Sequence, residues 1–462
     1  MAGATLSDGT GGPPRRDCVV VVVGDRIAWV GAGRDRVPLP RGAQIVDARG
    51  KFVIPGLMDA HTHWTEIENI VPPLYIANGV TSIREMWGYP EVRAVRRRID
   101  SGEVLGPRIV MASTVIDGPV SLLGPPAAFV ATPEAAREAV RQAKRDGADF
   151  IKVYSYLPPE CLLAIADESR LQGLPFVGHH VYRMAVGEVA DAGMRSFEHV
   201  HAMPIALSSR EAEFRAQIAA TPMDPADPRA FFRTMRELER QATATYSPAK
   251  AEAMYARWIR GGSWQSPTLT VNRVVSLPAE TYENDPRLKY IPADGRQFWH
   301  DRVRLFTPVT PEQIAQQREF QRFRLDLVRT MYEAGVGILA GTDCGNPYCF
   351  PGFGIHDELQ LLVEAGLTAM QALCVATRDA ARFLRREHMI GTVTAGKAAD
   401  LVILDADPLA DIRNTQRIDS VVTRGRLITR AQRLQLLADV EKAAQEPATR
   451  AAFPHMFAAC GC

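Results

Sequence analysis

The stretch Phe52–Trp64, FVIPGLMDAHTHW, most constrains what this chain can fold into. An apolar run leads into Asp59 and then into His61 and His63, which are separated by one residue. Because side chains two apart on a β-strand share a face, both imidazoles are expected to point at one spot past the end of a buried strand. Such a pair suits a divalent transition metal. The same pair also occurs as ordinary packed or surface histidines. Further metal-binding side chains elsewhere in the sequence are needed to distinguish the two interpretations.

The composition is that of a soluble globular protein. The chain has 462 residues, of which 46% are apolar and 23% charged, and is long enough for a large core with an accessory domain. A net charge of +1 argues against a nucleic acid or a membrane surface as a partner bound through charge, and leaves both a small-molecule substrate and a homo-oligomer open. The start of the chain resembles neither a signal peptide nor a membrane span, so a cytoplasmic protein is expected. The seven scattered cysteines suggest reduced thiols.

Short strands at the two chain ends are expected to form one small domain. Gly24-Asp25 is a hairpin signal between two of them. We infer that residues 1–51 and 389–430 pair into a composite β-sandwich, followed in 431–462 by a closing amphipathic helix and a tail, with Cys460 and Cys462, of unassigned role. The expected strands are Cys18–Val23, Arg26–Val30, Gln44–Val46, Gly391–Val393, Leu401–Leu404 and Ser420–Thr423.

Strand and helix signals alternate through residues 52–388. Thr132 before Pro133 predicts a helix start, and Thr368 with Gln371 is a capping box before a helix over Ala372–Leu384. This α/β pattern favours a parallel (β/α)8 TIM barrel, whose active site lies at the C-terminal strand ends. Helix-rich insertions at 202–262 and 272–318 flank the seventh strand. The eight expected strands are Val53–Met58, Val80–Met86, Arg108–Met111, Ala148–Tyr154, Pro175–His179, Arg195–His199, Ser266–Val271 and Gly337–Thr342.

Metal-binding types of side chain recur at the ends of the later strands. Lys152 lies in the fourth strand, where a lysine either reaches the rim or has its charge neutralised. His179 and His180 end the fifth and point to opposite faces, so only one can be a ligand. His199 ends the sixth, and Asp343, which alone would be an ordinary turn residue, ends the eighth. Together with the histidine pair of the first strand, these positions predict a metal centre.

This pattern and the text around it resemble the amidohydrolase superfamily, from about residue 15 to 428. The matching pieces include PGLMDAHTHW, NGVTSIREMWG, GADFIKVY, LAGTDCGNP and GTVTAGKAADLVILDADPLADI. Lys152 narrows the resemblance to members in which a carbamylated lysine bridges two metals. The nearest group is similar to the imidazolonepropionase-related amidohydrolases, which include prolidase-like (Xaa-Pro) and acyl-amino-acid carboxypeptidases.

The resemblance implies a binuclear centre. His179 is preferred over His180 because its distance of 20 residues to His199 matches the spacing of the family. Zinc is the default for mixed nitrogen and oxygen ligands, and iron, manganese or cobalt would also fit. The implied ligands are His61, His63 and Asp343 for the more buried metal and His179 and His199 for the more exposed one, with carbamylated Lys152 bridging both.

The implied activity is metal-dependent hydrolysis of an amide or peptide C–N bond in an N-acyl amino acid or dipeptide-like substrate. A hydroxide bridging the metals would attack, and Asp343 would carry its proton to the leaving amine. Three alternatives stay open: a lactone, carbamate or phosphotriester hydrolase, a mononuclear cyclic-imide hydrolase or deaminase, and a non-catalytic scaffold. Candidate substrate-binding residues are Trp64, Met86, Trp87, Tyr154, Tyr182, His201, Thr268, Thr270, Arg273 and Asn346.

Overall fold

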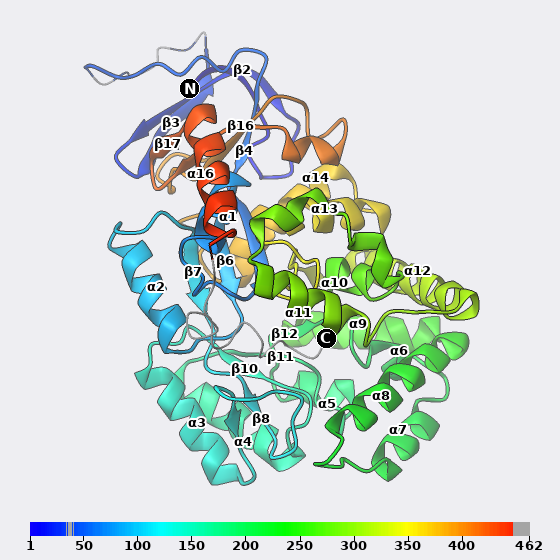
Figure 1. The fold of residues 1–462 in the computed structure, drawn as a ribbon. Helices are drawn as coiled ribbons and strands as arrows, with labels where there is room; N and C mark the ends of the chain where they lie inside the picture. The colour runs from blue at the N-terminus through cyan, green and yellow to red at the C-terminus, as the bar shows by residue number, and fades with distance from the viewer. Residues whose placement is uncertain (34, 36–38, 40, 447–462) are drawn as a thin grey trace.

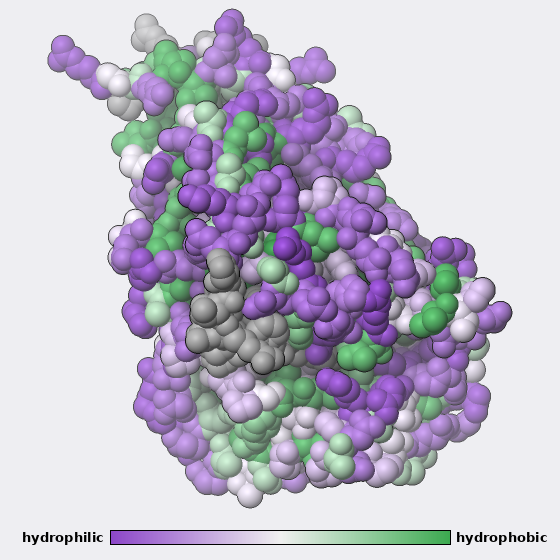
Figure 2. All heavy atoms as spheres, viewed as in Figure 1, coloured by the Kyte–Doolittle hydropathy of each residue, from purple (hydrophilic) through white to green (hydrophobic). Residues whose placement is uncertain are grey.

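The computed structural model describes residues 1–33, 35, 39 and 41–446, and pairs a β domain with a larger domain of parallel strands and helices (Figure 1). The face seen in Figure 2 is largely hydrophilic, with smaller hydrophobic areas. Among the described residues, no helix combines the length and apolar character that crossing a membrane requires. The apolar tail at 451–462 lies outside the described residues.

Strands from the two ends of the chain share one sheet. Its strand order is β17-β16-β15-β4-β1-β2-β3, and Figure 1 shows the N-terminal strands in blue beside those from the end of the chain. β4 runs antiparallel to β15, with Val53 opposite Ile403. Gly24, with φ of +59°, forms the turn between β2 and β3. The bounds are β1 (Ala2–Leu6), β2 (Arg15–Val23), β3 (Arg26–Ala32), β4 (Phe52–Pro55), β15 (Leu401–Leu404), β16 (Ile418–Thr423) and β17 (Arg426–Ile428).

Two strand predictions in this part of the chain are wrong, one strand was missed, and one predicted strand is divided between the two domains. Gln44–Val46 and Gly391–Val393 are not strands, and β1 was not expected. The predicted first barrel strand, Val53–Met58, is in fact the end of β4 in the β domain and the start of β5 in the α/β domain. Gly56 lies between the two strands. A Cβ atom at this position would clash with the Thr81 side chain, so only glycine fits there. The chain therefore changes sheets within the apolar run itself.

The α/β domain has two parallel sheets, of order β5-β6-β7 and β14-β13-β12-β11-β10-β8-β9. Backbone hydrogen bonds join them on both sides, from Ser113 N to Phe150 O at 2.8 Å and from Ala60 N to Ala340 O at 2.7 Å. These bonds join the edges of the two sheets, an arrangement consistent with the expected (β/α)8 barrel. The bounds are β5 (Leu57–Thr62), β6 (Val80–Glu85), β7 (Arg108–Met111), β8 (Ile116–Asp117), β9 (Ala128–Phe129), β10 (Ile151–Val153), β11 (Phe176–Gly178), β12 (Ser196–Glu198), β13 (Trp264–Ser266) and β14 (Gly337–Ile338).

Helices begin where capping signals stand. Thr132 accepts a hydrogen bond from Ala135 N at the start of α3, and Thr368 and Gln371 form the predicted capping box of α14. The helix expected over Ala372–Leu384 is divided by a π-helical turn at Val375–Asp379. The bounds are α1 (Val71–Ala77), α2 (Pro90–Asp100), α3 (Pro133–Arg145), α4 (Pro159–Gln172), α5 (Val186–Asp191), α6 (Met203–Ala206), α7 (Glu211–Ala220), α8 (Pro228–Ala242), α9 (Pro248–Gly261), α10 (Leu269–Val274), α11 (Ala293–Val303), α12 (Pro311–Ala334), α13 (Gly354–Glu364), α14 (Ala369–Cys374), α15 (Ala380–Phe383) and α16 (Arg430–Ala443).

The seventh strand lies earlier than predicted. β13 ends at Ser266, because Pro267 has no amide hydrogen with which to continue the ladder. Thr268 then takes a φ of +45° and opens α10, so most of the predicted strand Ser266–Val271 is a turn and a helix. This sharp reversal brings the Thr268 side chain to the candidate site described next.

Candidate metal centre

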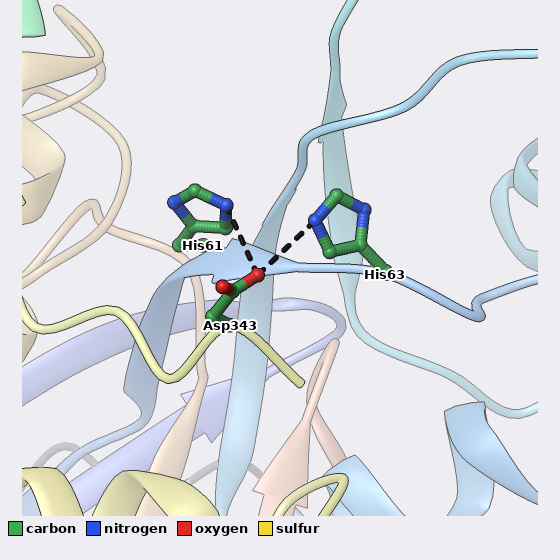
Figure 3. Close-up of side chains that lie close together, drawn as sticks. All are labelled: His61, His63 and Asp343. Carbon is green, nitrogen blue, oxygen red and sulfur yellow. Dashed lines mark ion pairs between the residues drawn. The ribbon is translucent and has the colours of Figure 1, made fainter. Parts of the chain in front are cut away.

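His61, His63 and Asp343 meet at the C-terminal end of β5 (Figure 3). The Nε2 atoms of His61 and His63 each lie 3.3 Å from Oδ1 of Asp343. One donor atom from each of the three buried residues lies within 4.8 Å of the others. Two imidazoles and a carboxylate converging in this way match the donor set of a divalent transition metal.

Asp59 fixes the geometry of this group. Its carboxylate accepts hydrogen bonds from Thr342 Oγ1 at 2.6 Å, Thr342 N at 3.0 Å and His61 N at 3.2 Å. Burial raises the pKa of Asp59 to about 7. Asp343 is the residue after Thr342. Its backbone has a φ of +57°, which turns the side chain back toward the end of β5. The aspartate of the sequence motif thus ties β5 to the loop that carries Asp343.

Glu198 and Arg84 lie behind His61, and sequence reasoning missed both. His61 Nδ1 donates to Glu198 Oε2 at 2.8 Å, which leaves Nε2 as the atom that faces Asp343. Arg84 Nη2 donates to both Glu198 oxygens at 2.9 Å, and its Nη1 donates to Ser196 Oγ at 2.8 Å. Burial alone would raise the pKa of Glu198, but Arg84 and the bond from His61 hold it well below its usual range. The only signal in the sequence was an acidic residue directly before His199.

His179 and His199 form a second group beside the first. Their rings lie 4.5 Å apart, and the His199 ring lies 4.8 Å from that of His61. His179 Nδ1 is hydrogen-bonded to Ser155 Oγ at 3.1 Å, and His199 Nδ1 to Thr268 Oγ1 at 2.7 Å. Burial lowers the pKa of His199, which favours the neutral imidazole that a metal requires.

Lys152 and His180 can be placed relative to these rings. Lys152 is fully buried, and its Nζ has no hydrogen-bond partner in the described part of the chain, so it does not reach the rim. Its charge contributes to the lowered pKa values of His61 and His199, after the larger effect of burial. His180 instead packs edge-on against Tyr182, with ring centroids 5.8 Å apart, and burial lowers its pKa to about 3.

These residues fit a divalent metal. The imidazoles of His61, His179 and His199 are each held by a hydrogen bond on one nitrogen. The Asp343 carboxylate lies between His61 and His63, and the buried amine of Lys152 has no hydrogen-bond partner among the described residues. The structure brings His61, His63, His199 and Asp343 into contact, with His179 against His199. Their roles as ligands stay predictions, as does carbamylation of Lys152.

The predicted substrate residues do not all lie at the centre. The Tyr154 ring lies 4.0 Å from that of His179, and the His201 ring lies 5.3 Å from His199 and 5.5 Å from His179. Tyr182 is fully buried, and its hydroxyl donates to Glu239 at 3.0 Å.

The other candidates have partners of their own. Trp64 stacks on Trp299 at 5.5 Å, and Trp87 packs edge-on against Tyr89. The remaining contacts are Arg273 with Asp357 at 3.4 Å, Asn346 Nδ2 with Asp343 O at 3.3 Å, and Thr270 Oγ1 with Glu358 at 2.7 Å. Asn346 therefore holds the backbone of the Asp343 loop, and Thr270 holds the start of α10.

One family model and several curated proteins match parts of this chain. Residues 308–428 match the model described as Amidohydrolase family. Curated relatives are the imidazolonepropionases of Geobacillus sp. (strain WCH70), 32% identical over 110 residues, or 23% of this chain and 26% of the relative, and of Anaeromyxobacter dehalogenans (strain 2CP-C), 57% identical over 47 residues, or 10% and 11%. The match thus spans about a quarter of the first relative and less of the second.

Solved structures match almost the whole chain. A bottromycin amidohydrolase aligns over 96% of this chain and 90% of its own, with a TM-score of 0.76 and 23% identity. A putative prolidase from Bifidobacterium longum aligns over 95% and 98%, with a TM-score of 0.65 and 25% identity. A Xaa-Pro dipeptidase with bound methionine aligns over 93% and 98%, with a TM-score of 0.65 and 22% identity. The fold is therefore shared over both domains.

Proposed function

We propose that this chain is a member of the amidohydrolase superfamily and a metal-dependent hydrolase of carbon–nitrogen bonds. The observation that carries the proposal is the convergence of His61 and His63 on one oxygen of Asp343, each at 3.3 Å, in a buried setting at a strand end. The names of the relatives, imidazolonepropionase and putative prolidase, support this type of bond.

We further propose two divalent metal ions, with zinc as the default. His61, His63 and Asp343 would hold one, and His179 and His199 the other. Carbamylated Lys152 would bridge the two metals. Lys152 is a candidate for this role because its buried Nζ lacks a hydrogen-bond partner among the described residues. Attack of the neutral amine on carbon dioxide, with loss of one proton, would convert it into a carbamate anion. That anion would offset part of the metals' charge in a site that excludes water.

When bound, divalent metals supply Lewis acidity, which lowers the pKa of water and polarises a carbonyl oxygen. The protein's own part is proton transfer and orientation. Asp343 lies within reach of both imidazoles and of His199, whose Nδ1 is 3.7 Å from its second oxygen. We propose that its carboxylate accepts a proton from the attacking water and delivers it to the departing nitrogen. Glu198 keeps His61 in one tautomer during this transfer.

The substrate class that we propose is an N-acyl amino acid or a dipeptide-like amide. The test is elemental analysis of the purified protein together with a hydrolysis screen over N-acyl amino acids, dipeptides, lactones and carbamates. We expect two metals per chain and activity on the amides. One metal per chain would favour the mononuclear alternative, and activity on lactones or carbamates alone would replace the C–N assignment.

Lys152→Ala tests the bridging role directly. We expect loss of metal and of hydrolysis, with partial recovery in short carboxylic acids such as acetate, which replace the bridging anion. Lys144→Ala is the matched control, because Lys144 lies exposed on α3. If Lys152→Ala kept both metals and full activity, the bridging role would be wrong.

A further inference from the structure

Arg324 on α12 is a buried guanidinium that forms no ion pair with an acidic side chain in the described part of the chain. Only 2% of its surface is exposed. Its Nη1 donates to Ser276 Oγ and Gln321 Oε1, both at 3.3 Å, and its guanidinium lies 3.8 Å from the centroid of the Phe320 ring. These partners are all uncharged, and Nη2 has no hydrogen-bond partner among the described residues. An arginine keeps its charge under all ordinary conditions, so burial of this kind is costly without an anion.

The carboxylate whose charge acts on this arginine, that of Glu239 on α8, already has hydrogen-bond partners. Its oxygens accept hydrogen bonds from Ala202 N at 2.7 Å, Tyr182 Oη at 3.0 Å and Arg236 Nη1 at 3.0 Å. Arg236 is therefore the guanidinium that Glu239 neutralises. Burial lowers the pKa of Arg324, and the neighbouring Arg236 lowers it further. Two guanidiniums thus share one carboxylate, and the cluster has an excess of positive charge.

This cluster lies against the candidate metal centre. Arg236 Nη1 donates to His201 Nδ1 at 2.8 Å, so the proton of that imidazole is on Nε2. His201 Nε2 is buried and has no hydrogen-bond partner in the described ranges. The His201 ring lies 5.3 Å from that of His199. A second chain of hydrogen bonds leads from Arg324 through Ser276. Ser276 Oγ donates to Asn272 O, and Asn272 Nδ2 donates to the backbone oxygen of Thr268, whose hydroxyl is bonded to His199.

We propose that Arg324, with Arg236 and His201 beside it, binds a carboxylate of the substrate next to the scissile bond. The inference rests on the proposed function and makes its substrate class more specific. The substrate would be an anionic amide, and its carboxylate would supply the ion pair that Arg324 does not form with the described residues. A guanidinium is a planar donor that matches a carboxylate, and His201 supplies a further unused N–H donor. Arg324 is a specificity-determining residue here, with no part in proton transfer.

The first experiment compares matched substrates. Hydrolysis of an N-acyl amino acid and of its carboxamide is measured in the wild type, Arg324→Gln and Arg322→Gln. Arg322 lies on the same helix but is exposed, so its variant is the control. We expect Arg324→Gln to raise KM for the carboxylate by about tenfold or more, the loss expected when a charged hydrogen bond is removed. Its KM for the carboxamide should change little. An equal effect on both substrates, or none, would overturn the inference.

The second experiment does not depend on turnover. Binding of N-acetylglycine and of N-acetylglycinamide to the purified protein is measured by calorimetry. We expect the wild type and Arg322→Gln to bind the acid more tightly than the amide, and Arg324→Gln to lose this preference. A protein that hydrolyses amides without a preference for carboxylates would retain the proposed function and lose this inference. A protein that prefers the acid in binding but hydrolyses nothing would support the carboxylate site and contradict the proposed function.

A stability measurement separates a ligand-binding arginine from a structural one. Arg324→Met removes the charge at similar volume, and replacing an uncompensated buried charge by an apolar side chain is expected to stabilise the ligand-free protein. We therefore expect a higher Tm together with the loss of carboxylate preference. A lower Tm, with the preference intact, would show that Arg324 serves the fold and not the substrate.

Discussion

Arg84 and Arg324 are both buried guanidiniums close to the candidate centre, but their surroundings differ. Arg84 forms ion-paired hydrogen bonds with both oxygens of Glu198 and donates further to Ser196 Oγ and Ala60 O. Arg324 has two neutral acceptors at 3.3 Å and an aromatic ring. We call the surroundings of Arg84, Glu198 and His61 the inner region, and those of Arg324, Arg236 and His201 the outer region. The hydrogen-bonding groups of Arg84 and Glu198 have partners within the protein, whereas in the outer region Arg324 Nη2 and His201 Nε2 have none among the described residues.

This difference indicates two tasks. A metal site needs ligands whose positions do not change, and a fully hydrogen-bonded network behind them provides this. A substrate site needs groups that are satisfied only when the substrate is present, because a group already paired in the protein gains little from a ligand. Mutations of the inner region should therefore affect metal binding, stability and turnover. Mutations of the outer region should affect substrate preference.

The largest effect is expected from Asp343→Asn. The amide keeps the shape of the side chain and one ligating oxygen but cannot carry a proton. Turnover should fall by ~10²–10⁴-fold, the contribution of a general acid–base group, while metal is retained. The measurements are kcat and metal content on the same sample. Asp326→Asn, at an exposed position on α12, should behave as the wild type. Full turnover in Asp343→Asn would exclude the proposed proton transfer.

Arg84→Met is the direct counterpart of Arg324→Met. We expect it to lower the stability of the ligand-free protein, whereas Arg324→Met should raise it. Removing Arg84 leaves Glu198 buried beside His61 without its cation. The expected loss in the free energy of unfolding is about 3–5 kcal/mol, the range for breaking a buried ion pair from one side. Denaturant unfolding of both variants measures it. If Arg84→Met were neutral or stabilising, the two arginines would not differ in the way proposed.

The sequence predicted the residues that face the centre better than the residues behind them. His61, His63 and Asp343 could be found because alternation along a strand and the position of strand ends are local features. The Arg84–Glu198 pair joins residues 114 apart, and nothing local marks either as a partner of the other. Arg324 was not found at all, since it lies in a polar-looking helix, and its contact with Ser276 joins residues 48 apart in sequence.

The strand predictions failed where tertiary structure decided the outcome. Ser266–Val271 has the β-branched and polar alternation of a strand, yet Pro267 ends the ladder and α10 begins two residues later. Glu358 on α13 makes that possible, because it accepts hydrogen bonds from Leu269 N and Thr270 N at the helix start. That partner is nearly ninety residues away in sequence. Fold class, in contrast, followed from the order of the elements and did not need such contacts.

Glu198→Gln should have an intermediate effect. The amide keeps a hydrogen-bonding group beside His61 but removes the charge that fixes the imidazole and balances Arg84. Loss of such an outer partner typically weakens metal binding by ~10–100-fold. Competition with a chelator of known affinity measures the change. Glu239→Gln is the matched outer variant and should leave metal affinity close to that of the wild type. Equal losses in both variants would remove the distinction between the regions.

The smallest effect is expected from Thr268→Val, at the boundary between the regions. Thr268 is hydrogen-bonded to His199 Nδ1 at 2.7 Å, and its backbone oxygen accepts from Asn272 on the side of Arg324. Valine keeps the shape and removes only the hydroxyl, so affinity should fall by ~10-fold for one metal, the lower end for an outer partner. The other metal, held by His61 and His63, should be unaffected, because those imidazoles face Asp343, whereas the Thr268 hydroxyl is bonded to His199. A two-step metal titration resolves the sites, with Thr330→Val as control. Loss of both metals together would mean that the two groups of histidines act as one site, and that Thr268 belongs with the inner region.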